Sequence, residues 1–339
     1  MWMIYGANGT TGRLVLSTWK RHFADLPPPI IAGRQESALR ELSESYRLSY
    51  RVLPLLKVAD LSLPSEVQLI VNLAGPYAYT TRPWIEACQR LGLAYMDVCG
   101  EWNVFEWLYN LKGVSIPIIT SAGYDTTIGE AALYFLRQRH PEAKRLKLGI
   151  HAKGGFSAGT VKSALTVLRE GYYFWRYGRL IPIPPRKEIW EVEPEKSYYF
   201  FCATLGELIT FPAWNPDIEE LSTWVRLPIS FFRWRFLLER LASWGLFRGL
   251  LERLLDAWRQ SLARHMDLTA RSYAFARSDT YQVRLTSPQP YVVTAWTVLG
   301  AVRLFLAENT QPGVASAFAR WREKLWQVLP DTEVVVSRL

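Results

Sequence analysis

The sequence opens with Met1-Trp2-Met3-Ile4-Tyr5-Gly6-Ala7-Asn8-Gly9-Thr10-Thr11-Gly12, and this stretch decides the fold. Its first five residues are a short apolar run, which predicts a buried β-strand. Three glycines follow with the spacing G-x-x-G-x-x-G, and the residues from Arg13 to about Phe23 have the pattern of a helix. A strand, a glycine turn and a helix in this order are typical of the start of a dinucleotide-binding domain.

The glycine turn predicts a pyrophosphate site. Glycines let backbone N–H groups approach a phosphate, and the N-terminus of a helix adds a favourable partial charge. Thr10 and Thr11 lie where the helix begins, so they can cap it or bind a phosphate oxygen. The turn residues expected to contact a cofactor are Gly6, Asn8, Gly9, Thr10, Thr11 and Gly12.

A second strand, Ile30-Ile31-Ala32-Gly33, ends at Arg34, which lies 22 positions after Gly12. NAD enzymes place an acidic ribose ligand near this offset, whereas an arginine there can pair with a 2′-phosphate. The cofactor expected is therefore NADP(H). The alternative is that Arg34 is only a solvated residue before the next helix, expected from Gln35 to Tyr46.

Strand and helix patterns continue to alternate along the first 120 residues. The run 67–73 is almost continuously apolar, as expected of a central parallel strand. The other expected strands are 50–53, 94–98 and 115–119, and the other expected helices are 82–91 and 102–111. Alternation at this pitch predicts an α/β fold with a doubly wound parallel sheet of the Rossmann type.

Ligands bind beyond the carboxyl ends of the strands in such sheets. The loop after the fourth strand is expected to lie along the cofactor through Asn72, Ala74, Gly75 and Pro76. Asp60, after the third strand, can contact the adenine side or cap a short helix.

Proton donors are expected at the same edge. The candidates are Tyr77, Asp97 and Tyr124, with Asp125 beside the last of these. Each can instead be purely structural, and solvent can also supply a proton.

Composition excludes several classes of protein. Hydrophobic residues make up 49% and charged residues 21% of the 339 residues, so a disordered chain is excluded. Three cysteines without a CxxC pair and four histidines argue against a disulfide scaffold or a zinc module, so no metal site is expected. The cysteine pattern suits a reducing, cytoplasmic compartment. Neither a signal peptide nor a membrane-spanning run is expected.

The net charge of +9 favours anionic partners. Because the sequence has no helix-turn-helix, RRM or zinc signature, nucleic acid is not an expected partner.

Three regions are expected along the chain. Residues 1–125 form the NADP-binding Rossmann domain, residues 126–287 an α+β substrate or dimerisation domain, and residues 288–339 a C-terminal helical segment. In the second region we expect a mostly antiparallel sheet with a helix over 157–170. The expected strands are 145–152, 198–204, 208–211, 269–276 and 280–286, with loops at 182–185 and 212–216.

The segment 228–264 is basic and amphipathic. Apolar residues recur there at steps of three and four, and residues 226–264 hold eight arginines against three carboxylates. Such a helical segment can pack in the core or in a homodimer, lie on a membrane or lipid surface, or line a substrate tunnel.

Five motifs together resemble the saccharopine dehydrogenase-like oxidoreductases, in the branch that includes trans-acting enoyl reductases. They are YGANGTTG, AGR, VNLAGPY, AYMDVCGE and SAGYD. The likeness continues in Gly154–Ala164, at 288–295 and at 310–314, and is thin from 166 to 286. It implies an NADP-binding domain, an α+β second domain and a C-terminal helix that packs back near the first domain.

The middle region is aromatic and aliphatic, which does not suit saccharopine, a substrate with several charges. The function expected is an NADP-dependent oxidoreductase that reduces an enoyl or keto group of a small hydrophobic, lipid- or polyketide-like substrate. The alternative is a non-catalytic NADPH-binding sensor or scaffold that associates with a membrane or a protein partner.

Overall fold

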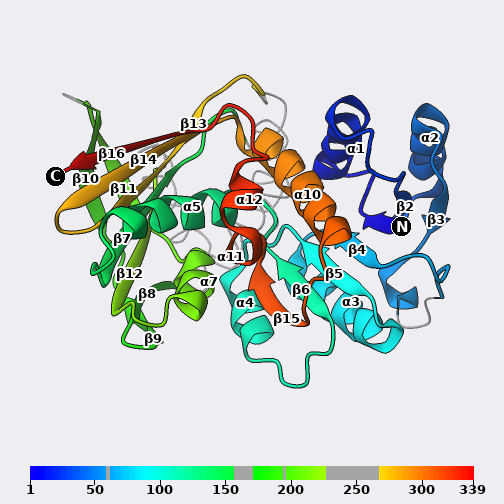
Figure 1. Ribbon diagram of the computed structural model, residues 1–339, viewed down its shortest axis with the longest axis horizontal. Helices are drawn as coiled ribbons and strands as arrows, with labels where there is room; N and C mark the ends of the chain where they lie inside the picture. The colour runs from blue at the N-terminus through cyan, green and yellow to red at the C-terminus, as the bar shows by residue number, and fades with distance from the viewer. Residues whose placement is uncertain (59–61, 156–170, 194–195, 227–266) are drawn as a thin grey trace, which may run out of the picture.

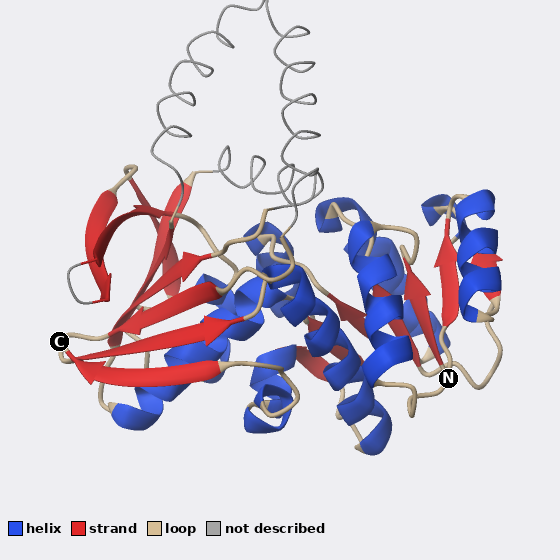
Figure 2. Cartoon of the chain, turned by 90° about the horizontal axis from the view of Figure 1, so that it is seen from above, coloured by secondary structure: helices blue, strands red, loops and turns tan. Residues whose placement is uncertain are grey.

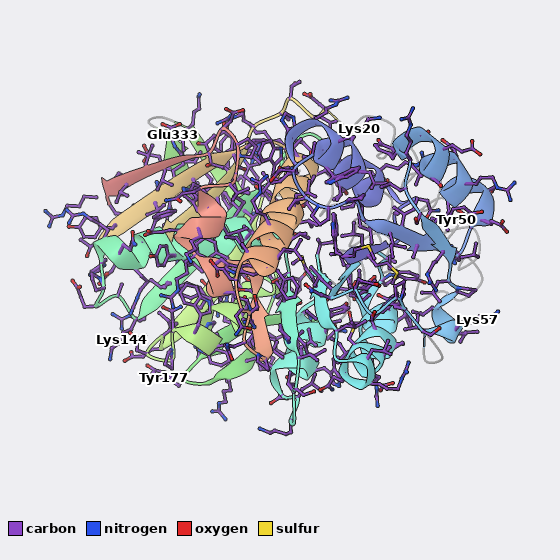
Figure 3. All side chains as sticks on the ribbon, turned by 45° about the vertical axis from the view of Figure 1, so that its right-hand side comes forward. Lys20, Tyr50, Lys57, Lys144, Tyr177 and Glu333 are labelled. Carbon is purple, nitrogen blue, oxygen red and sulfur yellow. The ribbon has the colours of Figure 1, made fainter. Side chains whose placement is uncertain are left out.

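Two β-sheets, each with its own helices, lie at opposite ends of the molecule (Figures 1 and 2). The computed structural model describes residues 1–58, 62–155, 171–193, 196–226 and 267–339. Lys20 and Tyr50 mark the end with the first sheet, and Lys144 and Tyr177 the end with the second (Figure 3).

The first sheet has seven strands in the order β3-β2-β1-β4-β5-β6-β15. Every pairing is parallel, and the strand order reverses between β1 and β4, which is the point where doubly wound sheets bind their ligands. The strands are β1 (Trp2–Tyr5), β2 (Ile30–Gly33), β3 (Tyr50–Val52), β4 (Leu69–Asn72), β5 (Ala94–Asp97), β6 (Pro117–Thr120) and β15 (Gly313–Ser316). The Rossmann-type sheet predicted from the sequence is confirmed.

Helices cover both faces of this sheet. The side chains of Trp2 and Ile4 join the core under α1 (Thr10–His22), α2 (Glu36–Tyr46) and α10 (Pro290–Ala307). Met3 and Tyr5, which point the other way, join the core under α3 (Tyr77–Leu91) and α4 (Trp102–Tyr109). Because both faces are buried, the strands are apolar at nearly every position.

The second sheet has nine strands, with the main order β10-β11-β12-β7-β13-β14-β16 and with β8 paired to β12 and β9. Only the pairing of β12 with β7 is parallel among those that the structure describes. The strands are β7 (Arg145–His151), β8 (Tyr172–Arg176), β9 (Arg179–Ile183), β10 (Lys187–Glu193), β11 (Lys196–Cys202), β12 (Glu220–Val225), β13 (Ser272–Arg277), β14 (Tyr281–Ser287) and β16 (Glu333–Arg338).

Opposite faces of the second sheet have different partners. Helices α5 (Tyr124–Arg139) and α7 (Glu207–Trp214) pack on one face over Leu146, Leu148 and other apolar side chains. An aromatic cluster that includes Trp190 lies on the other face. A Cβ at Gly149 would lie 2.5 Å from the Trp190 ring, so a glycine is required there.

The chain returns to the first sheet after β14. Helix α10 packs against α1, with the Trp296 ring 5.1 Å from that of Phe23. Strand β15 then extends the first sheet, the short helices α11 (Ala317–Trp321) and α12 (Glu323–Trp326) follow, and β16 adds to the second sheet (Figure 1). The sequence analysis did not anticipate either strand in this C-terminal segment, and the domain limits at 125 and 287 stay predictions.

Helix α10 bears on the expectation that the chain has no membrane-spanning run, which stays a prediction. It is long and apolar enough to span a membrane by length and composition alone. However, 61% of its apolar window is buried against the rest of the protein, and a core helix passes the same test.

Three expectations for the second region are wrong, wholly or in part. The run Leu208–Phe211 belongs to helix α7 rather than a strand, since Leu208 and Phe211, three residues apart, both face the core under α5. Pro182 and Ile183 end strand β9 instead of forming a loop, and Pro212 lies inside α7. The helix expected at 157–170, the basic segment 228–264 and Asp60 lie outside the described residues.

Candidate functional site

The glycine turn between β1 and α1 depends on two close approaches. Gly6 has φ +84°, and a Cβ there would lie 3.0 Å from the Cβ of Ala74 in the loop after β4. A Cβ at Gly12 would lie 2.5 Å from the carbonyl oxygen of Ala7. The two glycines therefore let the turn contact both the neighbouring loop and its own helix.

The first turn of α1 fits a pyrophosphate. Gly9 is the N-cap residue and forms no side-chain cap hydrogen bond, so it leaves space at the N–H groups of the first turn. Gly9 and Thr10 are exposed, and Thr11 is half-buried beside them. The helix N-terminus can thus receive an anionic group through its backbone and the threonine hydroxyls.

Asn8 joins this turn to the end of β2. Its Nδ2 donates a hydrogen bond to Gln35 Oε1 at 2.9 Å. Arg34, the residue before Gln35, is exposed. Burial raises the pKa of Tyr5, at the end of β1, and the positive charge of Arg34 partly opposes this rise. Arg34 therefore lies beside the glycine turn, where the sequence placed a 2′-phosphate contact.

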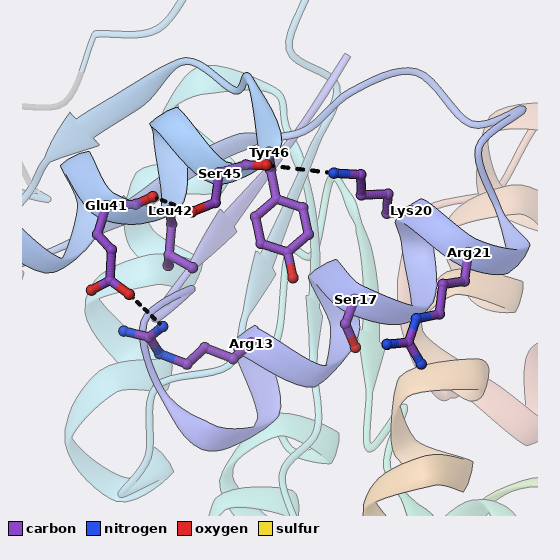
Figure 4. A pocket seen from close by; sticks show the side chains of 8 residues that line it. All are labelled: Arg13, Ser17, Lys20, Arg21, Glu41, Leu42, Ser45 and Tyr46. Atoms are coloured by element: carbon purple, nitrogen blue, oxygen red, sulfur yellow. Dashed lines mark hydrogen bonds and ion pairs between the residues drawn. The ribbon is translucent and has the colours of Figure 1, made fainter.

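Arg13 adds a second cation that the sequence analysis missed. Its Nε donates to the Asn8 carbonyl oxygen at 3.4 Å, and its Nη1 lies 3.4 Å from Glu41 Oε1. It lines a cavity of about 370 Å³ between α1 and α2, together with Lys20 and Arg21 (Figure 4). The available signal was its position directly after the third glycine.

The loop after β4 is held by a buried amide. Asn72 Oδ1 accepts from the backbone N–H of Ala74 at 3.1 Å, and its Nδ2 donates to Thr80 Oγ1 at 3.2 Å and Tyr95 OH at 3.0 Å. Asn72 is fully buried, whereas Gly75 is exposed and Ala74 and Pro76 are half-buried. Asn72 thus positions the loop, and the residues that follow it are accessible to a cofactor.

Glu101 is a functional candidate that sequence reasoning did not identify. Its two carboxylate oxygens accept from the backbone N–H groups of Tyr77, at 3.0 Å, and Ala78, at 2.9 Å. These are the first two residues of α3, so the carboxylate caps that helix and complements its dipole. The Tyr77 hydroxyl bonds to the backbone of Val98, and burial together with the charge of Asp97 raises its pKa well above the usual value.

Asp97 lies at the carboxyl end of β5 and is fully buried. Its Oδ1 accepts from Thr120 Oγ1 at 2.8 Å, from the Ser121 N–H at 2.9 Å and from the Cys99 N–H at 3.1 Å. Burial raises its pKa, and these hydrogen bonds oppose the rise. The carboxylate therefore ties the loops after β5 and β6 together.

Tyr124 and Asp125 begin helix α5, just after β6. The Tyr124 N–H donates to Thr294 Oγ1 of α10 at 3.0 Å, and its buried hydroxyl lies beside Ser272 and Ser287 of the second sheet. Asp125 is exposed, yet crowding by protein atoms raises its pKa to about 6. A Cβ at Gly100 would lie 3.6 Å from Asp125 Oδ2.

The structure brings most of the predicted site residues to one edge of the first sheet. The loop 98–101 lies between Tyr77 and Asp125, because Tyr77 bonds to Val98 and Asp125 faces Gly100. Tyr77, Asp97 and Tyr124 are buried, so of the four proton-donor candidates only Asp125 meets solvent. Within the described ranges, no three His, Cys, Asp or Glu side chains are grouped as a metal site.

Residues 2–139 match the family model of the saccharopine dehydrogenase NADP binding domain. The N-terminal part of this chain is therefore similar to that domain of the saccharopine dehydrogenases. This confirms the resemblance seen in the motifs and identifies the cofactor of the first domain as NADP(H). The open first turn of α1 and the exposed Arg34 fit that cofactor.

Two curated relatives match part of this chain. A protein of Mycobacterium tuberculosis, provisionally named a trans-acting enoyl reductase, is 30% identical over 49% of this chain and 43% of its own length. A saccharopine dehydrogenase-like oxidoreductase of Rattus norvegicus is 25% identical over 40% of this chain and 37% of its own. The matched part therefore spans less than half of either relative.

The whole fold resembles a solved member of the family. The apo saccharopine dehydrogenase (L-Glu forming) of Saccharomyces cerevisiae aligns over 100% of this chain and 99% of that one, with a TM-score of 0.65 and 13% identity. At this identity the likeness shows the fold, and it confirms the arrangement of a Rossmann-type sheet with a second mixed sheet.

Proposed function

We propose that this chain is an NADP-dependent oxidoreductase that reduces an enoyl or keto group of a hydrophobic, lipid- or polyketide-like substrate. The observation that carries the proposal is Asp125, an exposed carboxyl group at the edge of the sheet that binds NADP. Its raised pKa of about 6 lets it hold a proton near neutral pH. The trans-acting enoyl reductase relative supports the reaction class.

The residues around the site have separate roles in this proposal. Bound NADPH supplies the hydride. Arg34 and the glycine turn hold the cofactor, and Glu101 and Asp97 fix the loops on either side of the reacting carbon. Asp125 gives the proton that the reduced substrate needs. The Tyr77 hydroxyl bonds to Val98, in the loop that lies between Tyr77 and Asp125.

The test is oxidation of NADPH, followed by absorbance, with enoyl thioesters of increasing chain length. We expect turnover that improves with chain length and is lost in Asp125→Asn. Tight NADPH binding without turnover on any thioester or keto lipid would instead favour the sensor or scaffold. A cytoplasmic location remains a proposal. Contact with a lipid surface and a homodimer also remain proposals, since the segment 228–264 lies outside the described residues.

A further inference from the structure

Strands β7 and β12 end side by side in the second sheet. They are parallel, with Ile150 opposite Val225, and the Arg226 N–H donates to the Ile150 carbonyl oxygen at 2.9 Å. The residues at these carboxyl ends are His151 and Lys153 from β7 and the segment after it, and Arg226 after β12. Three nitrogen-bearing side chains are thus gathered where two parallel strands stop.

Aromatic rings hold this group together. Arg226 Nη1 contacts His151 Nε2, and its guanidinium lies 4.0 Å from the centre of the Tyr198 ring. Lys153 Nζ lies 4.9 Å from the centre of the Tyr273 ring. The His151 ring stands between the two tyrosines, at 5.7 Å from Tyr198 and 5.8 Å from Tyr273.

No acid in the described ranges balances the charges of this cluster. Among the described residues, no carboxylate lies within ion-pair distance of Arg226 or Lys153. The nearby Asp267, whose N–H donates to the Gly154 carbonyl oxygen, uses its Oδ1 on the N–H and hydroxyl of Thr269. His151 is 4% exposed, and burial plus the two cations lowers its pKa to about 3, so it is neutral. An anion would relieve the repulsion between Arg226 and Lys153.

A lysine on the same strand shows the contrast. Lys147 lies four residues before His151 and on the same face of β7. It also lies near an aromatic ring, that of Trp224. Its Nζ, however, is 2.8 Å from Glu188 and is already neutralised. Within the part of the chain that the structure describes, the cation without a carboxylate partner is therefore at the carboxyl end of this strand, and Lys147 further along it is paired.

This end of the second sheet adjoins the cofactor edge of the first. The Lys153 N–H donates to Ser272 Oγ at 2.9 Å, and Ser272 lies beside the hydroxyl of Tyr124. Tyr124 begins the helix that follows β6. A molecule that reaches from the site at Asp125 toward the second sheet would meet this cluster.

We propose that His151, Lys153 and Arg226 bind an oxyanion, a phosphate or a carboxylate, carried by the substrate. Arg226 and Lys153 supply the charge, the imidazole N–H of His151 donates a hydrogen bond, and the two tyrosine rings border an apolar arm next to the anion. The identity of the anion as part of the substrate rests on the proposed function, whereas anion binding itself does not.

Calorimetry on the full chain with saturating NADPH tests the site, because the bound cofactor keeps added phosphate away from the glycine turn. Inorganic phosphate and octanoate are titrated separately. Binding of phosphate alone indicates a phosphorylated carrier, and binding of octanoate alone indicates an acidic lipid. Either result supports the site, and binding of neither overturns it.

Variants locate the binding. In Arg226→Gln and Lys153→Gln we expect the Kd of the anion to rise about tenfold or more. Lys147→Gln removes the same charge from the same strand and should leave the Kd unchanged. Equal weakening in all three variants would show that only net charge matters and would overturn the proposal. If the parent chain binds the anion but turns over none of the enoyl or keto substrates, that result counts against the proposed reductase activity and not against the anion site.

Discussion

The Glu101 carboxylate accepts a hydrogen bond from the backbone N–H of Tyr77 at 3.0 Å, although the two residues are 24 positions apart. A second bond, from Ala78, completes the cap at 2.9 Å. The loop after β5 therefore holds the N-terminus of the helix that follows β4. This contact fixes the position of Tyr77 at the cofactor edge and joins two neighbouring strand ends of the Rossmann-type sheet.

Replacing Glu101 with alanine should lower the free energy of unfolding by about 2 kcal/mol, because the buried N–H of Tyr77 and the partly buried N–H of Ala78 lose a charged acceptor. Denaturant unfolding measures the change. Glu86→Ala is the matched control on the same helix, since Glu86 is exposed and forms an exposed pair with Arg82 at 2.9 Å. Its cost should stay below about 0.5 kcal/mol. Equal costs in the two variants would contradict a capping role for Glu101.

Arg34→Asp should shift the cofactor preference from NADPH toward NADH, because an aspartate repels a 2′-phosphate and can accept from a 2′-hydroxyl. We expect the Kd for NADPH to rise about tenfold to a hundredfold. The control is Arg40→Asp, since Arg40 is also exposed but lies within α2 and pairs with Glu36 at 3.0 Å. Unchanged affinities in Arg34→Asp would show that this residue does not contact the 2′-phosphate.

Two glycines of the turn should separate folding from binding. Gly12→Ala places a Cβ 2.5 Å from the Ala7 carbonyl oxygen, so we expect a loss of about 2 kcal/mol or more of stability. Gly9→Ala places a Cβ 3.3 Å from the Gly6 carbonyl oxygen, a milder contact, but fills space beside the first turn of α1. It should weaken NADPH binding about tenfold with little loss of stability. Thermal unfolding and cofactor titration of both variants check this difference.

Local patterns were sufficient to predict the first sheet. The apolar run before Gly6 and the glycine spacing are properties of adjacent residues, and β1, β2 and α1 follow the expected limits within a few positions. Arg34 could be singled out because its distance from Gly12 is set by one strand–helix–strand unit.

Contacts between distant segments could not be predicted. The bond from Tyr77 to Glu101 depends on how two strand ends meet, and β15 and β16 add to sheets whose other strands lie far away in the chain. The run Leu208–Phe211 fits a strand or a helix equally well in isolation, and packing against α5 decides for the helix. Whether Asp125 or its buried neighbours meets solvent likewise depends on the tertiary fold.

Stability should fall as the pH rises from about 5 to 8 because of Glu207. This residue is fully buried, neither of its carboxylate oxygens has a hydrogen-bond partner in the described structure, and burial raises its pKa from 4.5 to about 8. In that interval the folded state keeps a proton that the unfolded state has released, so rising pH favours unfolding.

The slope is about 1.4 kcal/mol for each pH unit from this one group. A glutamine side chain is uncharged at every pH, so the stability of Glu207→Gln should fall less as the pH rises. The loss that remains comes from the smaller upward pKa shifts of Asp125 and Glu130. Denaturant unfolding across the pH range is the measurement, and Glu219→Gln, at an exposed pair with Lys144, is the control. A steeper loss of stability in Glu207→Gln than in the parent chain would be inconsistent with a protonated Glu207.

Reduction should depend on the protonated form of Asp125. Its pKa of about 6 means that kcat/KM for an accepted substrate falls as the pH rises above that value, since less of the carboxyl group then holds a proton. Asp125→Asn cannot give a proton, so we expect kcat to fall about a hundredfold or more and the pH limb near 6 to disappear. NADPH binding should be unchanged. Asp25→Asn, at an exposed pair with Arg303, is the control and should keep the full profile. A pH limb that persists in Asp125→Asn would assign the proton to another group, with solvent or Tyr77 the next to test.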